Sequence, residues 1–129
     1  MRATLIICDT CAYSVEEKTR GGQTGGQWLA ALIERLVPAA PEVEIRRHSC
    51  LMGCAHSCNV ALSQPGKISY VLGGFRPESA AAEAILAFAR AYADSPTGQV
   101  PYRQWPQGVK GHFIARIPPL APADGASAE

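Results

Sequence analysis

Five cysteines in two short clusters constrain this chain more than any other feature of its sequence. The first cluster is Cys8 and Cys11, and the second comprises Cys50, Cys54 and Cys58. The first cluster directly follows an apolar, β-rich run at 3–7. The second follows a run from residue 43 in which apolar and charged residues alternate, as they do in a strand. Each cysteine cluster is therefore expected to follow the end of a predicted strand.

The remaining apolar pattern predicts the element order β-α-β-β-β-α. The predicted strands lie at 3–7, from 43, at 59–62 and at 68–72, and the predicted helices lie at 28–36 and from 77 to near 96. The continuous apolar run at 3–7 predicts a strand that is buried on both faces. Pro38 ends the first helical pattern, and Pro65-Gly66 marks the turn of a β-hairpin.

This order predicts an α/β sandwich of the thioredoxin type. A strand, a helix and a second strand in succession imply two parallel strands joined by a crossover. We expect this thioredoxin-like domain to span 1–95. Several prolines follow, and they predict an irregular C-terminal extension, 96–129, that packs on the domain through Tyr102, Trp105 and Phe113. Its tail, 121–129, is expected to be disordered.

Composition excludes several classes of protein. A chain of 129 residues that is 47% hydrophobic suits one domain, and no stretch is apolar enough to cross a bilayer. Lys and Arg total 12 against 11 Asp and Glu, which gives no excess charge for nucleic acid or an anionic membrane. An odd number of cysteines fits a disulfide framework poorly, and the first residues lack a signal-peptide pattern. We expect a cytoplasmic protein.

The cysteines have three chemical interpretations. Sites in parallel sheets collect at the carboxyl ends of strands, where four thiolates can converge: Cys8, Cys11, Cys50 and Cys54. Four thiolates suit a [2Fe–2S] cluster, and they also suit zinc. A chain with this much apolar sequence needs no metal to fold, which favours iron–sulfur over structural zinc. The third interpretation is a redox-active Cys-x-x-Cys at Cys8 and Cys11, although the glycine-rich connector at 19–26 delays the helix that such a motif requires.

Neighbouring residues have less specific interpretations. Cys58 precedes a predicted strand and can be a buried packing residue. His56 is expected to tune the site rather than bind metal, and His48, on an alternating strand, is expected to face solvent. The glycines at 19–26 lack both the P-loop and the dinucleotide pattern, so they predict a flexible connector.

The partner expected for such a site is another redox protein. Arg46, Arg47 and Lys67 follow or flank the predicted strands, where they can receive an acidic partner or form an ordinary solvated face. The small side chains of the alanine-rich second helix would permit close approach of a second copy, so a homodimer is a further alternative. No catalytic acid, base or substrate pocket is evident from the sequence, which predicts an electron carrier rather than an enzyme.

The chain resembles the thioredoxin-like [2Fe–2S] ferredoxins in three successive features. Cys8 follows a first strand, the stretch Cys50-Leu51-Met52-Gly53-Cys54 comes next, and a hairpin then leads to a helix beginning Arg76-Pro77-Glu78. This superfamily includes the ferredoxin-like subunit of NADH dehydrogenase and modules of hydrogenases. Within it, the chain is most similar to an uncharacterised bacterial family of predicted metal-binding proteins. That family shares the Cys-x-x-Cys, the Cys-x-x-x-Cys-x-x-x-Cys and an ending like residues 114–119, so the resemblance extends through Leu120.

The resemblance implies electron carriage by one [2Fe–2S] cluster, in a setting related to cobalamin metabolism. The ligands that it implies are Cys8, Cys11, Cys50 and Cys54. Two departures from typical thioredoxin-like ferredoxins leave the ligand set open. The spacing from Cys8 to Cys11 is short, and Cys58 is an additional cysteine that can replace Cys11 if Cys11 is turned away.

Overall fold

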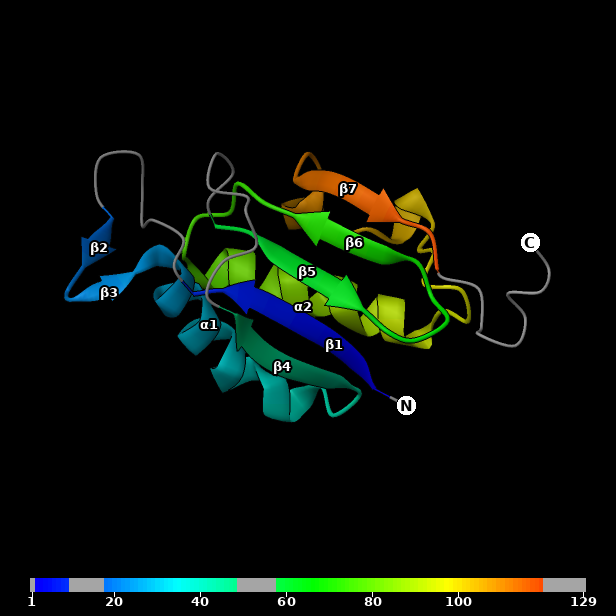
Figure 1. The fold of residues 1–129 in the computed structure, drawn as a ribbon, viewed down its shortest axis with the longest axis horizontal. Helices are drawn as coiled ribbons and strands as arrows, with labels where there is room; N and C mark the ends of the chain where they lie inside the picture. The colour runs from blue at the N-terminus through cyan, green and yellow to red at the C-terminus, as the bar shows by residue number, and fades with distance from the viewer. Residues whose placement is uncertain (1, 10–17, 49–57, 120–129) are drawn as a thin grey trace.

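The computed structural model describes residues 2–9, 18–48 and 58–119. Figure 1 shows the arrangement of the helices and strands. In chain order they are β1 (Ala3–Cys8), β2 (Thr19–Arg20), β3 (Gln23–Thr24), α1 (Gly25–Leu36), η1 (Val37–Ala39), β4 (Val43–His48), β5 (Val60–Ser63), β6 (Ser69–Leu72), α2 (Ser79–Asp94), η3 (Tyr102–Gln104), η4 (Gln107–Val109) and β7 (Phe113–Ile117). The elements marked η are short 3-10 helices.

The main sheet has five strands in the order β4-β1-β5-β6-β7. β1 and β4 are parallel, with Ala3 opposite Val43 and Cys8 opposite His48. β5, β6 and β7 each pair antiparallel with the preceding neighbour in the sheet. The predicted parallel β-α-β unit and the predicted hairpin are therefore confirmed, and the fold is the thioredoxin-like α/β sandwich that the sequence indicates.

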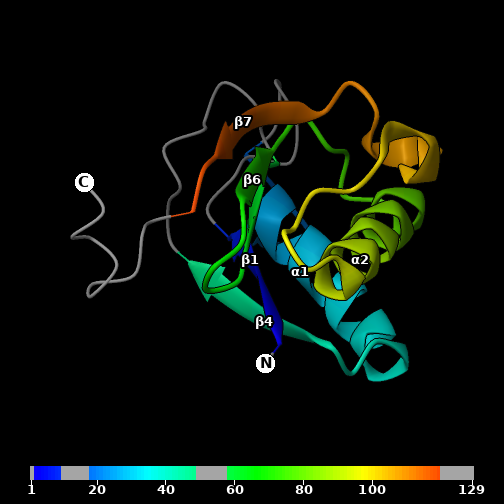
Figure 2. The ribbon, with the colours of Figure 1, turned by 90° about the vertical axis from the view of Figure 1, so that its right-hand side faces the viewer.

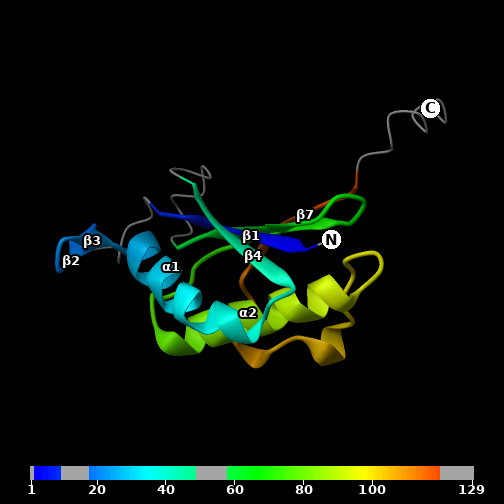
Figure 3. The same cartoon turned by 90° about the horizontal axis from the view of Figure 1, so that it is seen from below.

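Helices α1 and α2 cover the same face of this sheet (Figure 2). The view from below shows the sheet as one layer and the two helices as the other (Figure 3). Leu5 and Ile7 are 1% and 0% exposed beneath the helices, whereas Thr4 and Ile6 on the alternate positions are half-buried. The prediction that this first strand is buried on both faces was wrong, because the two helices of the described residues cover the same face of the sheet.

The helices begin and end where local chemistry directs them. Thr24 is the N-cap of α1, and Pro38 follows within the 3-10 turn that ends it. Helix α2 begins at Ser79, two residues after the expected start, with Glu78 at its N-cap position. It ends at Asp94, two residues before Pro96, where the sequence indicated an end.

The chain after α2 returns along that helix and adds a strand to the sheet edge. Phe113 contacts Phe88 of α2 with a ring separation of 5.2 Å, and Trp105 lies 4.4 Å from Phe113. Tyr102 stays 62% exposed and leans on Trp105 at 4.8 Å. The 3-10 turns agree with an irregular segment, but β7 was not among the expected strands. Residues 121–129, the expected disordered tail, lie outside the described residues.

The glycine-rich segment before α1 is a small hairpin. Strands β2 and β3 pair antiparallel, and the turn between them consists of Gly21 and Gly22, whose φ angles are 61° and 80°. Two consecutive positive φ angles suit a tight hairpin turn and favour glycine. The indole N–H of Trp28 donates to the Arg20 carbonyl at 2.8 Å. The glycines predicted to form a flexible connector therefore build a hairpin that is tied to α1.

Candidate metal centre

The parallel strands β1 and β4 end side by side. Cys8 is the last residue of β1, and it lies in register with His48, the last residue of β4. The ladder continues one step further, because the Asp9 N–H donates to the His48 carbonyl at 3.0 Å. Both cysteine-bearing segments, 10–17 and 49–57, follow directly from this edge. Their own residues, including Cys11, Cys50, Cys54 and His56, lie outside the described residues.

Strand β5 brings the fifth cysteine to the same edge. The Cys8 N–H donates to the carbonyl of Asn59 at 3.2 Å, and Cys58 is the residue directly before Asn59. Cys58 is held from its other side by Phe75, since the two residues exchange backbone hydrogen bonds of 3.0 and 3.3 Å. The structure thus brings two of the predicted cysteines to adjoining strand ends, with Cys8 at the end of β1 and Cys58 two residues before β5.

Both of these cysteines are buried in the hydrophobic core. Cys8 is 2% exposed and Cys58 is 0% exposed. Asn59, a polar residue, is buried beside them at 0% exposure. A reactive, nucleophilic cysteine normally requires a partly exposed thiol in a positively charged setting. The burial of Cys8 therefore argues against Cys8 as the attacking thiol of a disulfide oxidoreductase.

The amino end of helix α1 lies against the Cys8 backbone. A Cβ atom on Gly26 would fall 1.9 Å from the Cys8 carbonyl oxygen and 2.8 Å from the Asp9 Cα. Thr24 strengthens the contact, because its hydroxyl donates to the Asp9 carbonyl. The positive end of a helix dipole is thereby held at the cysteine edge, where it favours negative charge.

A capping box fixes this helix end. The Gln27 N–H donates to the Thr24 hydroxyl at 3.1 Å, and the Thr24 N–H donates to the Gln27 side chain at 2.9 Å. The helix starts well after Cys11, as the sequence indicated, and its first turn nevertheless reaches Cys8. Sequence reasoning missed Thr24 and Gly26. The Thr-x-x-Gln spacing was the available signal for the cap, but no local signal marks the close approach of Gly26.

The charged residues expected near the site are arranged differently from the prediction. Arg47 forms a two-point ion pair with Glu34 of α1, at 2.8 and 2.9 Å, which lowers the pKa of that carboxyl. Arg46 pairs with Glu44 at 3.1 Å. Lys67 lies at the far end of the sheet, on the turn between β5 and β6, where its ammonium donates to carbonyls at the end of α2. It is 9% exposed, so the expectation that Lys67 receives a partner near the cysteines was wrong.

Other expected features of the site have mixed outcomes. His48 is exposed at the end of β4, as predicted for a residue facing solvent. Within the described ranges, no group of three or more His, Cys, Asp or Glu side chains is placed to hold a metal ion. Three of the four proposed ligands lie outside those ranges, so the ligand set remains a prediction.

Among the described residues, no helix is long and apolar enough to span a membrane.

A family model described as "Protein of unknown function (DUF1636)" matches residues 5–119. The chain belongs to this family. No curated protein matches it. A solved structure, a thioredoxin-like [2Fe–2S] ferredoxin from Aquifex aeolicus, is similar with a TM-score of 0.52 and 12% sequence identity. The similarity covers 89% of this chain and 92% of the other, and at that identity it establishes the thioredoxin-like fold of this DUF1636 member and nothing finer.

Proposed function

We propose that this protein is an electron carrier that holds one [2Fe–2S] cluster on cysteine thiolates at the carboxyl edge of its sheet. The observation that carries the proposal is the register of β1 and β4, which places Cys8 opposite His48 and sends both cysteine segments out from one edge. The similar solved structure is described as a [2Fe–2S] ferredoxin, and it shares this chain's fold over nearly the whole length.

Chain connectivity supports convergence of the ligands. One residue spans at most about 3.6 Å. Cys11 is two residues after Asp9 and Cys50 is two residues after His48, so the chain limits each distance to about 7 Å. Cys54 is four residues from Cys58, which gives a limit of about 14 Å. The preferred ligands are Cys8, Cys11, Cys50 and Cys54, with Cys58 as the alternative for Cys11.

The described residues fit a cluster of net negative charge. Helix α1 directs its positive end at the Cys8 backbone, and its first-turn N–H groups have no intrahelical acceptors. The core residues around Cys8 exclude water from that side of the site. Such surroundings tune the potential of an iron–sulfur centre through charge, hydrogen bonds and burial. A bound cluster would supply the one-electron chemistry, and the protein would hold and shield it.

The finer parts of the proposal concern the setting. We place the carrier in the cytoplasm, where cysteines are kept reduced, and in metabolism related to cobalamin, on the family resemblance. Its partner would be an enzyme that accepts or donates single electrons.

Anaerobic purification followed by a visible spectrum and by iron, sulfide and zinc analysis tests the proposal. A ferredoxin gives red-brown absorption and about two irons and two sulfides per chain. A colourless protein with about one zinc, after reconstitution with iron and sulfide has failed, would replace it with a zinc module. Cys54→Ser sharpens the result, because it should abolish the chromophore of a ferredoxin but leave a disulfide reductase that uses only Cys8 and Cys11 active.

A further inference from the structure

An open pocket lies beside the cysteine edge, where the chain leaves β6 and enters β7. It has a volume of about 400 Å³ and is lined by Gly73, Gly74, Gly111, His112, Phe113 and Ile114. Gly74 and Gly111 have φ angles of 78° and 85°, and open space lies where a Cβ on Gly111 would project. Because Leu72 and Val60 are paired at this end of the sheet, the pocket shares its end with Cys58.

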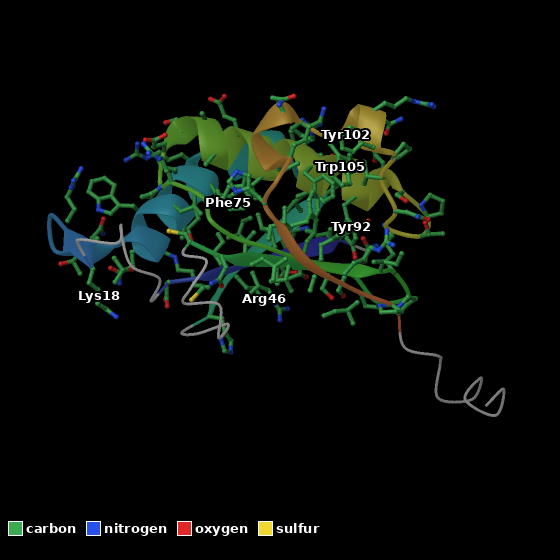
Figure 4. All side chains as sticks on the ribbon, turned by 90° about the horizontal axis from the view of Figure 1, so that it is seen from above. Lys18, Arg46, Phe75, Tyr92, Tyr102 and Trp105 are labelled. Atoms are coloured by element: carbon green, nitrogen blue, oxygen red, sulfur yellow. The ribbon has the colours of Figure 1, made fainter. Side chains whose placement is uncertain are left out.

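The wall of the pocket is joined to Cys58 through two aromatic rings. His112 stacks face to face on Phe75, with ring centres 4.3 Å apart and an interplanar angle of 7°. The His112 Nδ1 lies 2.8 Å from the Gly73 carbonyl, and the His112 carbonyl accepts from the Gly73 N–H. Phe75 in turn exchanges both backbone hydrogen bonds with Cys58. In Figure 4, Phe75 lies between Lys18 at one end of the molecule and Tyr92 toward the other.

The charged residues nearest in the chain to those lining the pocket are basic. Arg76 comes two residues after Gly74, Lys110 comes directly before Gly111, and Arg116 comes two residues after Ile114. No acidic residue lies within two positions of any lining residue. The Arg76 side chain is 84% exposed, and its guanidinium forms a long ion pair of 4.0 Å with the Glu78 carboxylate. An acidic surface is therefore the charge complement of these residues.

The pocket also offers apolar contact. Ile114 is 42% exposed, on an edge strand of the sheet. Arg46 and Arg47 near the carboxyl end of β4 form shorter ion pairs, with Glu44 at 3.1 Å and Glu34 at 2.8 Å, than the 4.0 Å pair of Arg76 with Glu78. Protein interfaces set apolar side chains within a polar rim, and Ile114 offers one such side chain.

We infer that an acidic redox protein docks on the His112 pocket, setting an apolar side chain against Ile114, and exchanges its electron with the cluster through the Phe75–His112 side. This inference rests on the proposed function. It commits to a protein partner of negative charge, and it moves the docking surface from Arg46 and Arg47 to Arg76, whose side chain is 84% exposed.

Two small oxidants of opposite charge test where the electron leaves the protein. Dithionite-reduced protein is mixed with ferricyanide or with hexaammineruthenium(III), and loss of the reduced spectrum is followed by stopped flow. One electron leaves the reduced cluster and reduces one oxidant ion. Arg76→Glu should slow ferricyanide about fivefold at low salt and accelerate the ruthenium complex, and both effects should vanish at high salt.

Arg35→Glu is the matched control. It makes the same change in net charge at an exposed residue in the last turn of α1, at the end of the helix opposite Gly26. Equal effects of Arg76→Glu and Arg35→Glu would overturn the inference. Absence of any chromophore in the wild-type protein would instead refute the proposed function, so the two failures are distinguishable.

The apolar part of the inference needs a protein probe. We would use an oxidised blue-copper protein of negative net charge as the acceptor. Ile114→Gln should slow this reaction severalfold while leaving the ferricyanide rate unchanged, because a small ion makes no apolar contact. An unchanged rate with the copper protein would overturn docking against Ile114.

Discussion

Gly26 at the start of α1 lies directly against the carbonyl oxygen of Cys8, so close that a Cβ on Gly26 would fall 1.9 Å from it. Only a residue without a side chain permits this approach. The contact sets the distance between the positive end of the helix and the edge of the sheet that carries the cysteines. It is therefore a structural requirement of the proposed cluster site, although Gly26 carries no chemistry of its own.

Gly26→Ala should destabilise the protein, whereas a change from glycine to alanine inside a helix usually stabilises it. Replacing glycine by alanine inside a helix normally stabilises by up to about 1 kcal/mol. Here the added methyl group meets rigid backbone, and we expect a loss of about 2 to 4 kcal/mol, measured by urea unfolding. The reconstituted cluster should also lose iron faster.

Ala31→Gly in the same helix is the control for Gly26. It should cost about 1 kcal/mol through helix propensity alone and leave iron retention unchanged. A Gly26→Ala protein as stable as the wild type would show that α1 does not approach Cys8 this closely.

Cys58→Ser tests the ligand list. Cys58 is fully buried in the core, and we expect the variant to keep its visible spectrum and about two irons per chain. Stability should fall by about 1 to 3 kcal/mol, because a hydroxyl replaces a sulfur in apolar surroundings. Cys58→Ala separates the two effects, since it removes the sulfur without adding a polar group. Loss of the chromophore in both variants would make Cys58 a ligand in place of Cys11.

Lys67 should contribute to stability through the end of α2. Its ammonium donates to the carbonyls of Tyr92 and Ala93, at 3.2 and 3.0 Å, in the last turn of the helix. Lys67→Met keeps the packing but removes one donor from both carbonyls, of which only that of Tyr92 also accepts from the Ser95 N–H in the described helix end, at 3.1 Å. We therefore expect a loss of about 1 to 3 kcal/mol in urea unfolding.

Lys110→Met is the matched control for Lys67. The Lys110 ammonium lies over the ring of the exposed Tyr102, at 4.6 Å, where a cation–π contact contributes about 0.5 to 1 kcal/mol. Equal losses in the two variants would mean that Lys67 has no special role at the helix end.

The sequence predicted those parts of the fold that local pattern determines. The alternation from Val43 and the apolar run before Cys8 were enough to predict two parallel strands, and Pro65-Gly66 was enough to predict the hairpin. β7 was missed because its residues show no alternation and stand among prolines. It forms a strand because β6 offers an edge, and a register shift opposite Val71 and Leu72 fits it there.

The site was predicted less completely, for a physical reason. Cysteine spacing predicts a ligand set, which stays a prediction because Cys11, Cys50 and Cys54 lie outside the described residues, and it does not show what packs around Cys8 and Cys58. The approach of Gly26 to Cys8 and the stacking of His112 on Phe75 join residues far apart in the chain, so no local pattern reveals them. Lys67 follows a turn signal that predicts exposure, and only the position of α2 buries it.

Tyr92 should make stability fall at high pH. Its hydroxyl is buried and donates to the Ile68 carbonyl at 2.6 Å, and burial raises its pKa from 10.0 to about 12. Above pH 10 the unfolded chain releases the phenol proton while the folded chain keeps it. The stabilisation is thus complete below pH 10 and is lost as the pH rises from 10 to about 12.

Urea unfolding at about pH 8 and about pH 11 measures this effect, and we expect Tyr92 to account for a loss of about 1.4 kcal/mol between them. The comparison must be made against Tyr92→Phe, because Lys67 also changes the stability in this pH range. Burial lowers the pKa of Lys67, so its contribution to stability increases as the pH rises toward 10.5. Tyr92→Phe should remove the Tyr92 share of the loss, whereas Tyr102→Phe, at a position 62% exposed, should retain it. The same pH dependence in Tyr92→Phe and in the wild type would show that the Tyr92 hydroxyl is not buried at the end of α2.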